Sequence, residues 1–130
     1  MSKSDIEQLD DVFSKFIRLS NADQWGMVRC ISCGKRMNWK QADNGHFVPR
    51  GNMSLRFDPK NCHPQCQECN RGKYGNIKDY REALVKRFGI VHVEYLESKK
   101  NEERDFAHFE IELLILHYTK EVKRLLQEKT

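Results

Sequence analysis

The sequence NCHPQCQECNR, residues 61–71, contains the residues from which the architecture of this chain can be inferred. It holds one C-x2-C pair, Cys66 and Cys69, and a second pair, Cys30 and Cys33, lies upstream. A C-x2-C turn can present two thiolates to one ion, and zinc takes four ligands in a tetrahedron. We therefore predict a structural Zn2+ site formed by the four cysteines, with no open position for water.

Paired cysteines also occur in redox sites and in iron–sulfur clusters. A thioredoxin-type site needs one C-x2-C pair in a βαβ context, which this sequence lacks. An iron–sulfur cluster is less usual with two pairs at this spacing. The fifth cysteine, Cys62, is interpreted as a small buried residue or a spare thiol.

Composition also favours a metal in the middle of the chain. Of the 130 residues, 38% are apolar and 32% are charged, and the net charge is +4. Residues 30–76 are poor in aliphatic side chains, so hydrophobic burial cannot offset the entropy of ordering them. We expect zinc binding to supply the missing free energy. Basic residues concentrate in the same segment, which is compatible with nucleic acid binding.

Helical periodicity frames this segment on both sides. Apolar residues recur at helical spacing in residues 4–20, with Ser4 or Asp5 as the cap. The same spacing recurs in residues 77–88, and Gly89 is a stop signal. The sequence thus predicts an α+β fold in which a small zinc-stabilised core is flanked by N- and C-terminal helices.

A third helix is predicted from about Glu102 to Glu128, capped by Asn101. Its apolar stripe is expected to comprise Phe106, Phe109, Leu113, Leu116 and Leu125. The helix carries more apolar residues than one narrow face accommodates, which suggests a second contact such as a homodimer partner.

We expect one domain over residues 1–130. It divides into a helix at 4–20, a zinc-braced core with its following helix at 25–88, and a C-terminal helical arm at 89–130. The sequence has no apolar run of the roughly 20 residues that a membrane span needs, and no secretory signal. Five cysteines without such a signal indicate a reducing compartment. We therefore expect a soluble cytoplasmic protein.

Residues suited to phosphodiester hydrolysis lie between and beside the cysteine pairs. The reaction needs an activated water, charge stabilisation at the phosphate and help for the leaving oxygen. A histidine can deprotonate the water, while a hard divalent ion with oxygen ligands serves the other two tasks. The groups of these kinds are Asp43, His46, Asn61, His63 and Asn70.

The combined motifs resemble a known family. D-N-G-H-F, R-G-N, L-R-F-D, N-C-H-P-Q-C-Q-E-C-N-R and G-N-I-x-x-Y resemble the bacteriophage lambda NinG (Rap) recombination family. The resemblance covers roughly half of the chain. The order C-x2-C, D-x-G-H, N-x-H, C-x2-C-N is also similar to zinc-braced His-Asn-His nucleases with a ββα-metal core. The resemblance implies an endonuclease that uses Mg2+ or Mn2+ on branched DNA, such as D-loops and Holliday junctions, during phage or prophage recombination.

The resemblance also implies catalytic roles. His46 would be the general base. Asn61 would hold the His46 ring through a backbone contact and fix its tautomer. His63 would supply a second imidazole near the ion or contact the phosphate.

The magnesium ligands follow the family pattern less closely. Many relatives carry an Asp directly before the base, where this chain has Gly45. Asp43 is the nearest acid and is our choice of first ligand. Asn70, which replaces the usual final histidine, would be the second ligand.

Four basic residues are expected to contact DNA phosphates, although a solvated basic surface is the alternative. They are Arg50, Arg56, Arg71 and Lys73. Two other functions compete with the nuclease. One is a zinc-knuckle DNA-binding recombination factor without chemistry, and the other is a structural zinc protein that acts through protein partners.

Overall fold

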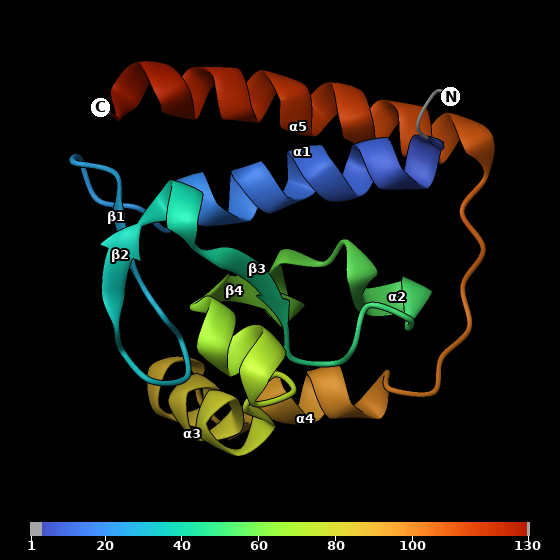
Figure 1. Ribbon diagram of the computed structural model, residues 1–130. Coiled ribbons are helices and arrows are strands. Elements are labelled where there is room, and N and C mark those ends of the chain that lie inside the picture. Colours follow the sequence, from blue (N-terminus) through green and yellow to red (C-terminus); the bar gives the residue numbers. More distant parts are fainter. Residues whose placement is uncertain (1–3, 130) are drawn as a thin grey trace.

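The computed structural model describes residues 4–129. Helices combine with two small antiparallel sheets, which confirms the predicted α+β class. Figure 1 shows three layers: α1 and α5 on one side, the β3–β4 hairpin in the middle, and α3 and α4 on the other side. None of the helices within residues 4–129 is long and apolar enough to cross a membrane.

Helix α1 spans Asp5–Ser20 and begins where the sequence indicates. Ser4 is its N-cap, and the Ser4 side chain accepts a hydrogen bond from the Glu7 backbone N–H at 3.2 Å. This bond satisfies one of the amide groups left free at a helix start. The buried face of α1 repeats at helical spacing and comprises Leu9, Phe13 and Ile17.

The first sheet carries the first cysteine pair. Strand β1 (Met27–Arg29) pairs with β2 (Arg36–Asn38), and Cys30 and Cys33 lie in the turn between them. Gly34 closes this turn with a φ of +80°, a conformation that residues with a Cβ rarely adopt. The short 3-10 helix η1 (Trp39–Gln41) then leads to the second sheet.

The second sheet is the centre of the molecule. Strand β3 (Asp43–His46) pairs with β4 (Cys62–Gln65), with His46 opposite Cys62 and Asp43 opposite Gln65. The connection between the strands contains two short helices, α2 (Met53–Arg56) and η2 (Pro59–Asn61). Strand β4 ends at the second cysteine pair, which leads into the π-helical turn η3 (Glu68–Gly72).

Helices α3 (Ile77–Phe88) and α4 (Ile90–Ser98) cover one side of the hairpin, and Gly89 joins them with a φ of +91°. Their fully buried residues pack with side chains of the hairpin connection, and this core comprises Phe47, Val48, Leu55, Tyr80, Leu84, Val93 and Leu96. The other side of the hairpin packs on α1 and α5 through Phe57 and Cys62.

Helix α5 spans His108–Glu128, so the predicted start at Glu102 with an Asn101 cap is wrong. The preceding residues instead form an extended strap that returns from α4 to the start of α1, orange in Figure 1. The Phe106 ring packs edge-on against Phe57 with ring centroids 5.9 Å apart, which holds the strap extended.

The buried face of α5 also differs from the expected stripe. Of that stripe, Phe109, Leu113 and Leu116 are exposed, and the residues that pack on the body of the molecule are Ile111, Tyr118, Val122 and Leu125. Helix α5 presents two apolar faces, and periodicity alone cannot identify the one that meets α1. The homodimer contact through α5 stays a prediction, with the exposed face as its surface.

Helices α1 and α5 run parallel, and a polar contact joins them at each end. His108 Nδ1 lies 2.7 Å from Asp5 Oδ2 where both helices begin. At their ends, Lys129 Nζ donates to the carbonyl oxygen of Leu19 at 2.6 Å and to that of Ala22 at 2.8 Å. The first and last helices therefore form one layer.

Candidate metal centre and adjoining cleft

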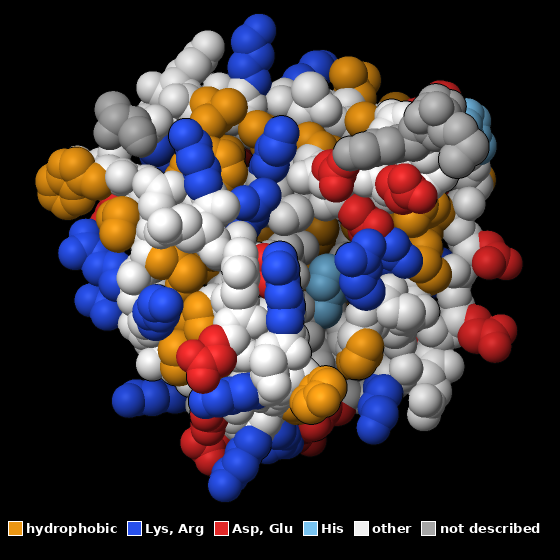
Figure 2. Space-filling view, viewed as in Figure 1, with side chains coloured by type: hydrophobic (Ala, Val, Ile, Leu, Met, Phe, Trp, Pro, Cys, Tyr) orange, Lys and Arg blue, Asp and Glu red, His pale blue; other side chains and the backbone are white. Residues whose placement is uncertain are grey.

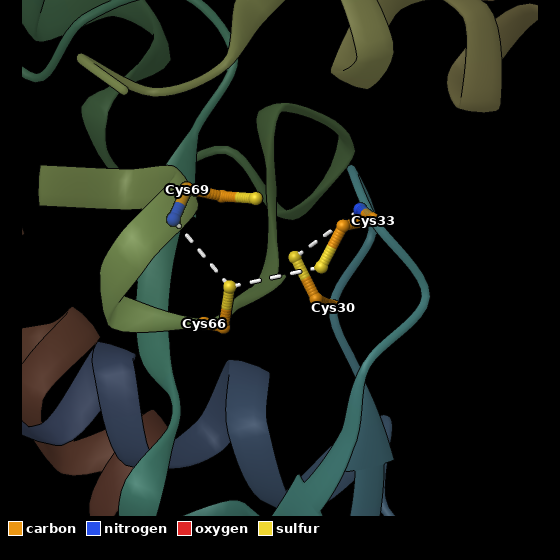
Figure 3. A group of neighbouring side chains, drawn as sticks. All are labelled: Cys30, Cys33, Cys66 and Cys69. Atoms are coloured by element: carbon orange, nitrogen blue, oxygen red, sulfur yellow. Dashed lines mark hydrogen bonds between the residues drawn. The ribbon is translucent and has the colours of Figure 1, made fainter. Parts of the chain in front are cut away.

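The four cysteines of the two C-x2-C pairs converge, as Figure 3 shows. Their Sγ atoms all lie within 4.8 Å of one another, and Cys33 Sγ lies 3.8 Å from Cys66 Sγ. A zinc ion with Zn–S bonds of about 2.3 Å separates tetrahedral ligands by roughly 3.8 Å. Within residues 4–129, this is the one group of three or more His, Cys, Asp or Glu side chains with such a spacing. The donor set therefore fits the predicted structural Zn2+.

Backbone amides around the cysteines favour their thiolate forms. The Cys33 N–H faces Cys30 Sγ at 3.5 Å, and the Cys69 N–H faces Cys66 Sγ at 3.4 Å. Burial alone would raise the pKa of Cys30, but backbone N–H donors outweigh it and the pKa is lowered. Burial raises the pKa of Cys69 to about 12, so without a metal this thiol keeps its proton at neutral pH.

A buried glutamine connects the metal centre to the β3–β4 hairpin. Gln65 Nε2 donates to Ser32 Oγ at 2.8 Å and to the Gly75 carbonyl oxygen at 2.6 Å. The Gln65 side chain also covers Gly45, because a Cβ added there would lie 2.1 Å from Gln65 Oε1. Gln65 thus connects the four-cysteine centre to the hairpin whose strand β3 carries Asp43 and His46.

A cleft of about 460 Å³ opens beside this strand. It is lined by five of the residues that the sequence singled out, namely Asp43, His46, Arg50, Asn70 and Arg71. Figure 2 shows a recessed histidine near the middle of this face, between Lys and Arg side chains. The predicted site residues therefore contribute an imidazole, a carboxylate, an amide and two guanidinium groups to the lining of one cavity.

The His46 ring is oriented by a backbone carbonyl. Its Nε2 lies 2.9 Å from the Arg56 carbonyl oxygen. A carbonyl oxygen only accepts, so Nε2 carries the proton and Nδ1 keeps a free lone pair. Burial and the nearby Arg50 and Arg56 cations lower the pKa of His46, although the Arg56 carbonyl and Asp10 raise it. At neutral pH the ring is a neutral base.

The hydrogen bonds of Asn61 hold the backbone next to His46 and not its ring: the Asn61 carbonyl oxygen accepts from the Phe47 N–H at 2.9 Å. The role of Asn61 in fixing the His46 tautomer stays a prediction. Asn61 Oδ1 accepts from the Val48 N–H at 2.8 Å, and its Nδ2 donates to the carbonyl oxygens of Val48 at 2.9 Å and Leu55 at 3.3 Å. Asn61 is fully buried and braces the connection between β3 and α2. Its influence on His46 is therefore indirect, through the segment that carries Arg56.

Strand β3 and turn η3 contribute carboxylate and side-chain amide oxygens to the cleft. Asp43 Oδ2 accepts from Asn70 Nδ2 at 2.9 Å. Arg71 binds the same carboxylate through two N–H groups, Nε to Oδ2 at 2.9 Å and Nη2 to Oδ1 at 2.8 Å. Asn44 Oδ1 is buried and has no partner among the described residues. These carboxylate and amide oxygens suit a hard divalent ion, while Arg71 neutralises the carboxylate in its absence.

His63 lies away from the cleft, so its expected role near the ion or the phosphate is corrected. The side chain is 5% exposed and its Nδ1 lies 3.2 Å from the Tyr80 hydroxyl. The Tyr80 hydroxyl donates to the Gly45 carbonyl oxygen at 2.8 Å. Burial lowers the pKa of His63 to about 4. His63 is a neutral core residue.

The four basic residues fall into different environments. Arg50 and Arg56 both bind Asp10 of α1, Arg50 through Nη2 at 2.7 Å and Arg56 through Nε at 3.0 Å. The Arg56 side chain is only 17% exposed, so it is a structural residue that helps to hold the His46 ring. Arg50 and Arg71 stay exposed at the cleft, and Lys73 is exposed beyond it.

Helix α1 supplies a wall of the cleft that the sequence analysis did not identify. Asp10, Ser14 and Arg18 line it at a spacing of four residues. Arg18 donates through Nη1 to the Trp39 carbonyl oxygen at 3.2 Å. A polar stripe directly beside the apolar stripe of α1 was the signal available in the sequence.

Comparisons with known proteins give similar sequences from bacteriophages. A family model described as "Bacteriophage Lambda NinG protein" matches residues 2–128. Proteins named ninG from Salmonella phage P22 and Escherichia phage 933W are 38% identical over 100 residues, and that of Escherichia phage lambda is 37% identical. Each match covers 76% of this chain and 47% of the relative, so the chain spans about half the length of these relatives. No solved structure matches.

Proposed function

Since this chain belongs to the bacteriophage lambda NinG family, we propose that it is a metal-dependent endonuclease that hydrolyses DNA phosphodiester bonds. The observation that carries the proposal is the free Nδ1 of a neutral His46 in a cleft shared with Asp43 and Asn70. We further propose, from the resemblance alone, that its substrates are branched DNAs of phage or prophage recombination.

In this proposal His46 accepts a proton from water at Nδ1. The lowered pKa keeps the ring available as a base at neutral pH. The Arg56 carbonyl already accepts the Nε2 hydrogen of the neutral ring, and this hydrogen bond strengthens when the ring becomes an imidazolium on proton transfer. Positioned bases of this kind contribute about 10²- to 10⁴-fold to a rate.

A divalent ion, when bound, supplies positive charge at the phosphate and at the leaving oxygen. Asp43 and Asn70 would hold it through side-chain oxygens. Arg71 now pairs with Asp43, so it would exchange this carboxylate for the DNA phosphate. Arg50, exposed on the other side of the cleft, would make a second phosphate contact. The succession of β3, β4 and the turn η3, which bears Asn70, supports a ββα-metal arrangement.

A second candidate is a zinc-knuckle DNA-binding factor without chemistry. The observation that favours it is Gly45, which carries no carboxylate where many relatives of the nuclease class have one. The Gln65 side chain fills the space that such a carboxylate would need. Only Asp43 then supplies a formal negative charge from β3.

Cleavage of labelled linear duplex, single-stranded and four-way-junction DNA by the zinc-loaded protein tests the proposal. We expect cutting with Mg2+ or Mn2+ and none without them. His46→Ala should reduce the cleavage rate by about 10²-fold or more, because the base is lost. His117→Ala, an exposed histidine on α5, is the matched control and should cut normally.

DNA binding by the His46→Ala protein should persist. Wild-type cleavage rates in this variant would remove His46 from the mechanism. Tight binding without cutting under every metal would instead establish the zinc-knuckle factor.

A further inference from the structure

The loop that follows η3 presents one aromatic ring almost completely to solvent. Tyr74 is 92% exposed, compared with 64% for Trp25 and 63% for Phe109, the next most exposed Phe, Tyr or Trp residues of the described chain. A tyrosine ring usually stabilises a protein by burying its large apolar area. Tyr74 makes no such contribution to the fold.

The backbone of this loop is strained where it holds the ring. Tyr74 has a φ of +50°, and Gly75 and Asn76 follow with φ values of +91° and +44°. An aromatic residue rarely adopts this left-handed conformation, which suits glycine and asparagine. Strain of this kind persists only where the surrounding structure imposes it, and it is frequent at functional sites.

The metal centre imposes it here. The Gly75 N–H donates to the Cys69 carbonyl oxygen at 2.9 Å, and Asn76 Nδ2 donates to Cys69 Sγ at 3.4 Å. The Gly75 carbonyl accepts from buried Gln65 at 2.6 Å. The loop is therefore fixed to a zinc ligand, and the Tyr74 backbone loses little entropy when the ring binds something.

The charges beside the ring indicate the class of ligand. Arg71 and Lys73 are exposed within three residues of Tyr74, and Lys78 is exposed at the start of α3. Along the sequence the nearest acids are Glu68, which is exposed, and Asp79, which accepts from Asn76 Nδ2 at 3.0 Å. Asp43 pairs with Arg71 in the DNA-free protein, and Lys73 and Lys78 form no such ion pair within residues 4–129. An exposed ring flanked by cations is the combination with which proteins bind single-stranded nucleic acid.

The ring also lies near the proposed catalytic centre. Tyr74 lies four positions after Asn70 in the sequence, and four residue steps span at most about 14 Å. Turn η3 and its loop lie between the β3–β4 hairpin and α3 (Figure 1). A ligand held at the cleft can therefore reach Tyr74 within a few nucleotides.

We propose that Tyr74 is a stacking platform for an unpaired base of the DNA, and that it makes the protein prefer DNA with unpaired bases. The inference rests on the proposed DNA function but not on the cleavage step. Bases inside a duplex have no free face for an external ring, whereas single strands and opened junctions offer one. Arg71 and Lys73 would contact the flanking phosphates.

Binding of the zinc-loaded protein to single-stranded, four-way-junction and linear duplex DNA, without added Mg2+ or Mn2+, tests this proposal. The variant Tyr74→Asn removes the ring and suits the left-handed backbone, so its melting temperature should not fall. We expect it to lose roughly 5- to 100-fold in affinity for the unpaired substrates, the range that one stacked base gives, and less than twofold for duplex.

Three controls separate the explanations. Tyr74→Trp should keep the affinity, and Trp25→Ala should bind as the wild type does, because Trp25 lies in another turn. A 2-aminopurine in the single strand should be quenched by the wild type and less by Tyr74→Asn.

Unchanged or uniformly reduced affinity of Tyr74→Asn for all three DNAs would overturn the platform, while the endonuclease proposal would stand. A wild type that binds no DNA at low salt would overturn both.

Discussion

Gly45 is the residue at which this chain departs most visibly from the nucleases that it resembles. It lies under the buried Gln65 side chain, which is held by Ser32 and Gly75. The amide that connects the zinc centre to the hairpin thus occupies the space of a carboxylate next to His46. The departure has a steric cause, and in the proposed mechanism Asp43 would serve as the metal ligand in place of that carboxylate.

We expect Gly45→Ala to destabilise the protein by roughly 1–3 kcal/mol, because the added methyl group overpacks this site. Gly51→Ala is the control, since an added Cβ there meets nothing within 4 Å, and it should stay within about 0.5 kcal/mol. Urea denaturation of the zinc-loaded proteins measures both.

The double variant Gly45→Ala with Gln65→Ala should be less destabilised than the sum of the two single variants, because removing the amide makes room for the methyl group. Strict additivity would show that Gln65 is not the obstacle.

At the scale of single residues, the side chains that form the candidate site could be predicted from the sequence, but the backbone groups that orient them could not. The cysteine spacing identified a convergent set of thiols, and the motif order brought Asp43, His46 and Asn70 to one cleft. The carbonyl of Arg56 could not be found, because its contact with His46 depends on how residues 47–55 fold back. His63 was misjudged, since no local pattern tells whether a strand residue faces a cleft or a core.

Among the structural elements, the two turns that carry the cysteine pairs should depend most strongly on a bound metal ion for their stability. The first sheet has strands of only three residues, and its buried cluster contains three cysteines and two alanines beside only two larger apolar side chains, Val28 and Met37. Such a sheet has little apolar burial of its own. Its stability should come from the bound ion.

We expect one zinc per chain by elemental analysis, and Cys66→Ser should lower this content strongly because it removes one ligand. Cys62→Ala is the matched control: this cysteine packs against α1 and α5 instead, so the zinc content should not change. Chelation of the wild type should lower its melting temperature. Full zinc content in Cys66→Ser would contradict the four-cysteine site.

Element boundaries were predictable where a local signal sets them. Ser4 begins α1 and Gly89 separates α3 from α4, since a cap and a positive φ act over a few residues. The start of α5 was not predictable, because Phe106 is held in the strap by Phe57, a residue distant in the chain. Tertiary packing there overrides helical periodicity.

At the scale of the whole molecule, buried histidines make stability depend on pH. His63 has a pKa of about 4 in the folded protein against an ordinary 6.5. Between these values the unfolded chain binds a proton that the folded protein does not, so the free energy of unfolding rises with pH across this window. Above pH 6.5 the contribution is complete.

We expect the free energy of unfolding to fall by up to about 3 kcal/mol on this account between pH 6.5 and 4, since each tenfold change in proton affinity is worth about 1.4 kcal/mol. His63→Gln should flatten the profile relative to the wild type, while the exposed His117→Ala should leave it unchanged. Denaturation at several pH values measures the difference between the wild type and His63→Gln. The acid sensitivity of the zinc ligands is the same in both proteins and therefore cancels in this difference. Equal slopes in wild type and His63→Gln would contradict it.

The parallel pairing of α1 with α5 has a consequence for biosynthesis. A ribosome adds about 5–20 residues per second, so the apolar face of α1 waits roughly 5–20 s for its partner helix to be made. The zinc ligands are complete earlier, once Cys69 has emerged. The nascent chain can therefore close its metal core while the side of α1 that packs on α5 is still uncovered, and during that interval this side is the surface that chaperones and proteases would meet.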